Sequence, residues 1–128
     1  MEASVVVATH DFAVRDVLDR FFTNRNYSVS FEQMGSKAIL KLLEKPIDIF
    51  ILDLDDDDNS TLDIIEVIRR TRPRLPIVVL SDSTSLDRVR RLSEAGVFYC
   101  AMKPVQIMEI EKVVEALERY RQNQRNGI

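Results

Sequence analysis

Residues 48–59 read DIFILDLDDDDN, where an apolar run of four residues stops at a carboxylate, Asp53, and an acidic loop follows. A run this short, rich in branched and aromatic side chains, is typical of a strand buried on both faces, as in a parallel sheet covered by helices. Asp53 therefore falls at the carboxyl end of a strand. Ligands bind at that edge in open parallel sheets, so the other side chains that reach it are candidate site residues.

The composition is that of a globular domain of ordinary size. The chain has 128 residues, 45% hydrophobic and 30% charged, which is enough to bury a core without disulfides or structural metal. Its net charge of −3 disfavours direct nucleic-acid binding, which normally needs a basic surface. No apolar run reaches the ~20 residues of a membrane span, so we expect a cytoplasmic protein without a membrane partner. The single cysteine, Cys100, is expected to pack as a small buried hydrophobe.

Strand-like and helix-like segments alternate along the chain. Segments with the pattern of strands are residues 5–8, 27–31, 49–52, 77–80 and 98–102. The period-2 pattern over 27–31 predicts a strand at a sheet edge, with one wetter face. Helical spacing follows each strand, with caps expected at Asp11, Ser60 or Thr61, and Gly96. These units predict a single α/β domain, (βα)5, with a mainly parallel sheet over residues 1–122, and a polar tail or the beginning of a linker over residues 123–128.

Polar residues follow four of these strands and would meet at one edge of the sheet. They are Thr9, His10 and Asp11 after the first strand, Asp53 and Asp55 after the third, Ser81 and Asp82 after the fourth, and Lys103 after the fifth. Asp53, Ser81 and Lys103 together suit phosphoryl transfer: the carboxylate can attack phosphorus, while the ammonium and the hydroxyl bind the oxygens. Mg²⁺ would screen the two negative groups. Each residue alone is more often a turn or cap former, and their joint placement is what indicates a site.

The same residues resemble the receiver domain of two-component response regulators, without gaps from Val5 to about Tyr120. The resemblance is carried by the apolar run into Asp53, the serine after IVVL (Ser81), the Lys103-Pro104 pair and the helix spacing between them. It implies a flavodoxin-like three-layer sandwich with strand order 2-1-3-4-5.

The resemblance also implies a function. A partner histidine kinase or phosphotransfer protein would phosphorylate Asp53, and Ser81 and Lys103 would contact the phosphoryl group. The bond before Pro104 would be cis. A domain of this kind is no enzyme beyond its own phosphorylation and dephosphorylation, and it would form homodimers through the fourth and fifth predicted helices.

The expected metal site departs from the pattern of that family. Receivers usually end the first strand with two acidic residues that hold Mg²⁺, and those positions are Thr9 and His10 here. By the resemblance, Asp53 and the backbone carbonyl of Asp55 remain as ligands. Asp11, one place later, could be a single remaining acid, but a helix N-cap accounts for it equally well. For His10 we favour a polar strand terminator over a ligand.

Two further departures leave three functions open. Asp82 replaces a small residue and would either repel a phosphoryl group or supply a metal ligand, and Cys100 stands where an aromatic ring usually turns inward. The chain could be a phosphorylatable receiver, or a pseudo-receiver that binds partners without phosphorylation. The motif ILDLDDD also resembles the D-x-D motif of haloacid-dehalogenase-type phosphohydrolases. Two strand–helix units precede the motif and no cap insertion fits, which argues against this third class.

Overall fold

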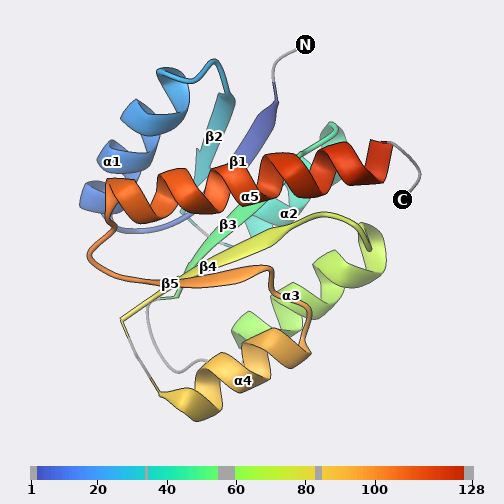
Figure 1. Ribbon diagram of the computed structural model, residues 1–128. Helices are drawn as coiled ribbons and strands as arrows, with labels where there is room; N and C mark the ends of the chain where they lie inside the picture. The colour runs from blue at the N-terminus through green and yellow to red at the C-terminus, as the bar shows by residue number, and fades with distance from the viewer. Residues whose placement is uncertain (1–2, 34, 55–59, 83–84, 126–128) are drawn as a thin grey trace.

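The computed structural model describes residues 3–33, 35–54, 60–82 and 85–125 (Figure 1). Strands and helices alternate in this part of the chain: β1 (Ser4–Ala8), α1 (Phe12–Thr23), β2 (Ser28–Glu32), α2 (Gly35–Glu44), β3 (Ile49–Leu54), α3 (Ser60–Thr71), β4 (Ile77–Ser81), α4 (Leu86–Glu94), β5 (Tyr99–Met102) and α5 (Ile107–Arg125). None of the helices in the described ranges is both long and apolar enough to cross a membrane.

The five strands form one parallel sheet in the order β2-β1-β3-β4-β5, which confirms the predicted fold. Helices α1 and α5 cover one face, and α2, α3 and α4 cover the other (Figure 1). Strand β3 is buried at every position, as its continuous apolar run predicts. Strand β2 lies at the edge and is only partly buried, in agreement with its period-2 pattern.

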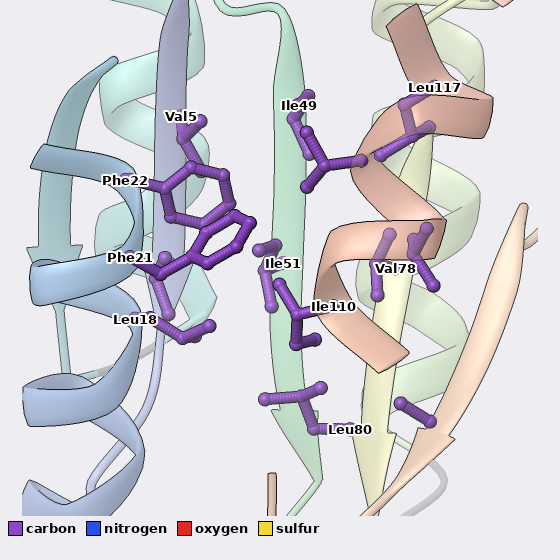
Figure 2. Close-up of a cluster of buried hydrophobic side chains, with 14 of the residues drawn as sticks. Val5, Leu18, Phe21, Phe22, Ile49, Ile51, Val78, Leu80, Ile110 and Leu117 are labelled. Carbon is purple, nitrogen blue, oxygen red and sulfur yellow. The ribbon is translucent and has the colours of Figure 1, made fainter. Parts of the chain in front are cut away.

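The pleat of β3 divides its side chains between two cores. Ile49 and Ile51 pack with residues of α1 and α5, and Figure 2 shows them among Phe21, Phe22 and Leu117. The alternate residues of β3 pack under α2, α3 and α4. Because successive side chains of a strand point to opposite faces, the side chain of Asp53 lies on the same face of the sheet as those of Ile49 and Ile51. The fold therefore places Asp53 on the face that α1 and α5 cover.

The structure corrects several expected boundaries. Strand β3 continues through Leu54, two residues beyond the predicted end, so Asp53 lies inside the strand. Helix α3 already begins at Ser60, so Ser60 and Thr61 belong to its first turn and not to its cap. Helix α5 reaches Arg125, and residues 123–125 are helical where a tail was expected. Gln and Arg favour helices, and an ion pair anchors Arg121.

Helix α4 lies largely at the surface of the domain. Leu86 and Val89 are exposed, and Leu92 is the only buried residue of this helix. The apolar spacing that identified the helix therefore does not mark a core-facing stripe. As predicted, a glycine follows the end of α4: Ala95 is the C-cap residue, and Gly96 has a φ of 94°, a conformation that side-chain-bearing residues rarely adopt.

Candidate functional site

Asp53 and Thr9 meet because β1 and β3 are parallel neighbours. Ala8 pairs with Leu52, so the next residue of each strand, Thr9 and Asp53, continues the same register and the same face. The Thr9 hydroxyl donates a hydrogen bond to Asp53 Oδ2 at 2.6 Å. Thr9 Oγ1 in turn accepts the backbone N–H of Asp11 at 3.0 Å. Since this N–H occupies an acceptor position of the hydroxyl, the hydroxyl proton is directed toward Asp53.

Lys103 completes the site from the loop after β5. Its Nζ lies 2.8 Å from Asp53 Oδ1, 3.9 Å from Asp82 Oδ2 and 4.0 Å from Asp11 Oδ2. The peptide bond between Lys103 and Pro104 is cis, as predicted. The Asp53 side chain has 0% of its surface exposed and the Lys103 side chain 11%. The phosphoacceptor candidate and its cation therefore form an enclosed ion pair.

The charges around Lys103 keep it protonated. Burial by itself would lower the pKa of Lys103, because a buried ammonium loses hydration. The hydrogen bond and charge of Asp53 act in the opposite direction, as do the charges of Asp82 and Asp11, so the pKa is raised above its ordinary value. One ammonium thus lies within 4.0 Å of three carboxylates and attracts all of them.

Ser81 ends β4 directly before Asp82, but the alternation of the strand places its side chain on the other face of the sheet. In the ladder, Asp53 pairs with Leu80, while Ser81 pairs with Leu54 and Met102. Alternation along β4 therefore directs Ser81, like Val79, to the face that α3 and α4 cover. Ser81 is buried, and its backbone carbonyl accepts the N–H of Lys103 at 2.9 Å. Its contact with a phosphoryl group stays a prediction.

Asp11 has one of the two roles that the sequence left open, the helix N-cap, and its role as a metal ligand stays a prediction. Its Oδ1 caps α1 by accepting the N–H of Ala13 at 2.9 Å, and its Oδ2 faces Lys103. Asp82 is 69% exposed, so it lies at the mouth of the site and not in its interior.

The remaining predicted site residues lie around this centre. His10 is exposed directly after β1, where a strand terminator was expected. Asp55 lies outside the described residues. Cys100 corrects an expectation: it is only partly buried, because it lies on β5, an edge strand of the sheet, and α4 covers it incompletely. Burial raises its pKa.

A cavity of about 330 Å³ opens beside Lys103, between α1 and the loop after β5. Its lining includes Asp11, Asp82, Val14 and Pro104. This volume is at the lower end of the range for ligand pockets. Charged groups therefore face a space that solvent or a small group can enter.

Both carboxylate oxygens of Asp53 have partners within the protein. Oδ2 of Asp53 accepts the Thr9 hydroxyl, Oδ1 pairs with Lys103, and no group of three or more acidic, cysteine or histidine side chains in the described ranges is arranged to hold a metal. In the sequence, Thr9 is evident only as the loss of a metal ligand. Its role as a hydrogen-bond donor to Asp53 depends on the register of β1 against β3, which the strand-end residues alone do not give.

Comparison with known proteins agrees with this class of fold. The sequence model of the response regulator receiver domain matches residues 5–115. The chain is 30% identical over 113 residues to the DNA-binding transcriptional regulator NtrC of Azospirillum brasilense, covering 88% of this chain and 24% of the relative. It is 27% identical over 111 residues to NtrC of a Bradyrhizobium strain, covering 87% and 23%. The chain thus spans about a quarter of the length of these relatives.

Solved structures of receiver domains have the same fold. A CheY-like receiver domain protein from Methanospirillum hungatei superimposes with a TM-score of 0.84 at 18% identity, covering 96% of this chain and 99% of that one. A response regulator receiver protein from Pseudomonas putida gives 0.80 at 25% identity, covering 91% and 98%.

The fold and site define a single (βα)5 domain with an aspartate–lysine pair at the carboxyl edge of a parallel sheet. The chain belongs to the response regulator receiver domain family of two-component signalling. The family is one of signalling domains. The match places the chain in this family and not among the phosphohydrolases that ILDLDDD also resembles.

Proposed function

We propose that the chain accepts a phosphoryl group on Asp53 and changes its protein contacts in response. A histidine kinase or a phosphotransfer protein carrying phosphohistidine is the donor. A carboxylate oxygen of Asp53 attacks phosphorus, the phosphorus–nitrogen bond breaks, and the imidazole leaves with the electron pair and takes up a proton. The observation that carries the proposal is Lys103 Nζ at 2.8 Å from Asp53 Oδ1, where an ammonium can also bind phosphoryl oxygens.

Intact mass after incubation with acetyl phosphate and Mg²⁺ tests this proposal. We expect the mass to increase by one phosphoryl group in the wild-type protein and not in Asp53→Asn. Asp87→Asn is a matched control, because Asp87 is an exposed aspartate of α4 paired with Arg90 and Arg91. Absence of an adduct, or an adduct that persists in Asp53→Asn, would contradict phosphorylation at this site.

We propose a weak requirement for Mg²⁺, taken from the family pattern. Asp53, the backbone carbonyl of Asp55 and, more distantly, Asp11 are the candidate ligands, and the cation would supply charge neutralisation between carboxylate and phosphoryl group. Adduct formation over a series of Mg²⁺ concentrations, with EDTA as the zero point, tests this. A yield that is the same throughout the series would refute the requirement.

A second candidate is a pseudo-receiver that binds partners without phosphorylation. It is favoured by the enclosure of Asp53, whose two oxygens are engaged by Thr9 and Lys103. In that case the network around Asp53 is structural. The acetyl phosphate experiment separates the two candidates, because a pseudo-receiver gains no mass.

The proposed output surface is formed by α4, β5 and α5. Exposed apolar side chains gather on these elements: Leu86, Val89, Tyr99, Met102, Ile107 and Met108. A cavity of about 600 Å³ lies among residues of β5 and α5, including Tyr99, Met108 and Lys112. We propose a homodimer through this surface when Asp53 is phosphorylated. Sedimentation with and without beryllofluoride tests it, and an unchanged monomer would count against dimerisation driven by phosphorylation.

A further inference from the structure

A second charged cavity lies at the opposite end of the domain from Asp53. Its volume is about 450 Å³, and it is bounded by the residues before β3, the turn between α3 and β4, and the last turns of α5. Strands β3 and β4 begin there, whereas Asp53 lies near the carboxyl end of β3. Figure 1 shows the end of α5 far from the loop after β5 that carries Lys103. The two cavities are therefore separate sites.

The rim of this cavity is strongly basic in a chain of net charge −3. Among the described residues, four arginines line it, Arg72, Arg74, Arg121 and Arg125, against one acid, Asp48. Asp48 is already neutralised, because its Oδ1 lies 3.2 Å from Arg121 and its Oδ2 accepts the N–H of Ser4 at 2.7 Å.

The other three arginines have no carboxylate partner in the described part of the chain. Arg72 donates to the backbone carbonyls of Thr71 and Leu42, and Arg74 and Arg125 are exposed. Guanidinium groups are matched to phosphate and carboxylate oxygens, which they bind in a bidentate manner. Their convergence on one cavity indicates an anionic ligand.

The walls below this rim are apolar and include an aromatic ring. Ile47, Leu75 and Pro76 contribute aliphatic surface, and Leu75 and Pro76 are buried. The Tyr120 ring is held in place by Phe98, with ring centroids 5.6 Å apart, and its hydroxyl donates to the carbonyl of Arg74 at 3.4 Å. Inorganic phosphate would leave these walls in contact with water. The volume lies within the range of pockets for small organic ligands.

We propose that this cavity binds a small organic phosphate of nucleotide size, with the phosphates on Arg74 and Arg125 and a planar ring against Tyr120 and the aliphatic wall. The ligand lies on the amino edge of the sheet and does not require phosphorylation of Asp53. Arg121 and Arg72 have structural partners, so they position the rim. Arg74 and Arg125 are the ligand-binding residues.

Titration calorimetry with uridine 5′-diphosphate as the probe tests this site. We expect binding to the wild-type chain in the millimolar range or tighter, and weakening of about tenfold or more in the double variant Arg74→Gln/Arg125→Gln. Arg20→Gln/Arg90→Gln is the matched control, with the same loss of charge at exposed arginines of α1 and α4. Thermal denaturation of both double variants checks that the fold is retained.

Three further binding measurements test which class of ligand the cavity binds and whether binding occurs at this cavity. Uridine without phosphate is expected not to bind, and inorganic pyrophosphate is expected to bind more weakly than the nucleotide. Asp53→Asn should bind the nucleotide as the wild type does, which separates this site from phosphorylation at Asp53. Absence of binding to the wild type, equal affinity for pyrophosphate, an unchanged affinity in Arg74→Gln/Arg125→Gln, or loss of binding in Asp53→Asn would each overturn the proposal.

Discussion

Replacing Thr9 by valine tests whether the Thr9 hydroxyl holds Asp53 in place. Valine preserves the shape of threonine but removes the donor that lies 2.6 Å from Asp53 Oδ2 and the acceptor of the Asp11 N–H. Both Thr9 and Asp53 are buried, so water cannot readily replace the lost hydrogen bonds. We therefore expect Thr9→Val to reduce the free energy of unfolding.

The expected magnitude follows from the charge of the acceptor. A hydrogen bond to a charged group contributes about 1.5–3 kcal/mol, and a buried group left unpaired costs a similar amount. The extra methyl group of valine offsets part of this, at roughly 0.8 kcal/mol for a fully buried carbon. We expect a net loss of about 1–2 kcal/mol, a measurable share of the ~5–15 kcal/mol of a typical domain.

Urea denaturation followed by circular dichroism measures this loss. Thr71→Val is a matched control, since the Thr71 hydroxyl donates to the neutral backbone carbonyl of Val67 near the end of α3. We expect the control to change the free energy of unfolding by no more than about 0.5 kcal/mol.

A double-mutant cycle then shows whether the lost energy belongs to the pair. In an Asp53→Asn background the acceptor is neutral, so Thr9→Val should cost about 1 kcal/mol less than in the wild type. The reasoning is refuted if Thr9→Val costs no more than Thr71→Val, or if its cost is the same in both backgrounds.

Four other changes test the pocket and the fold. Lys103→Met should destabilise the protein by about 3–5 kcal/mol in urea denaturation, because it leaves a buried carboxylate unpaired; a loss below about 1 kcal/mol would contradict the enclosed ion pair. Asp82→Asn should raise the rate of phosphorylation by acetyl phosphate several-fold, since the lost charge lies 3.9 Å from the Lys103 ammonium, and a slower rate would indicate a metal ligand instead. Gly96→Ala should cost about 1–2 kcal/mol in urea, because φ is 94° and the new Cβ would lie 2.9 Å from Arg69 Nε; no loss would refute the strain. Burial first, and then a hydrogen bond to a carboxylate, raise the pKa of Tyr27 from 10.0 to about 12. The contribution of Tyr27 to the free energy of unfolding is therefore complete below pH 10 and lost between pH 10 and 12. Urea denaturation at a series of pH values should show that the free energy of unfolding falls less steeply with pH over this range in Tyr27→Phe than in the wild type.

The sequence predicts the fold because each strand carries its own signal. The apolar run before Asp53 and the alternation over residues 27–31 distinguish a central strand from an edge strand without reference to the rest of the chain. Helix α4 shows the limit of this reasoning. Leu86 and Val89 have helical spacing but remain exposed, because period alone does not say which face meets the sheet.

The sequence predicts which residues gather at the site but not which of them contact one another. Asp53 and Lys103 follow from strand ends, and the structure brings them to 2.8 Å. The bond from Thr9 to Asp53 depends on the register of β1 against β3, and Ser81 falls on the other face because β4 alternates from Leu80. Register is a property of the assembled sheet, so strand-end residues alone could not give either result.

The balance of charge at Lys103 links the two functional candidates. Three carboxylates share this ammonium, and phosphorylation would replace the single charge of Asp53 by a phosphoryl group with nearly two. The ammonium must then leave Asp53 Oδ1 to contact the phosphoryl oxygens, while Thr9 can keep its hydrogen bond to Oδ2. If Asp82, at the exposed mouth, turns toward solvent, Lys103 can follow the phosphoryl group and the chain acts as a switch. If Asp82 stays beside the ammonium, the added charge lacks compensation and the enclosed pair favours the unphosphorylated state.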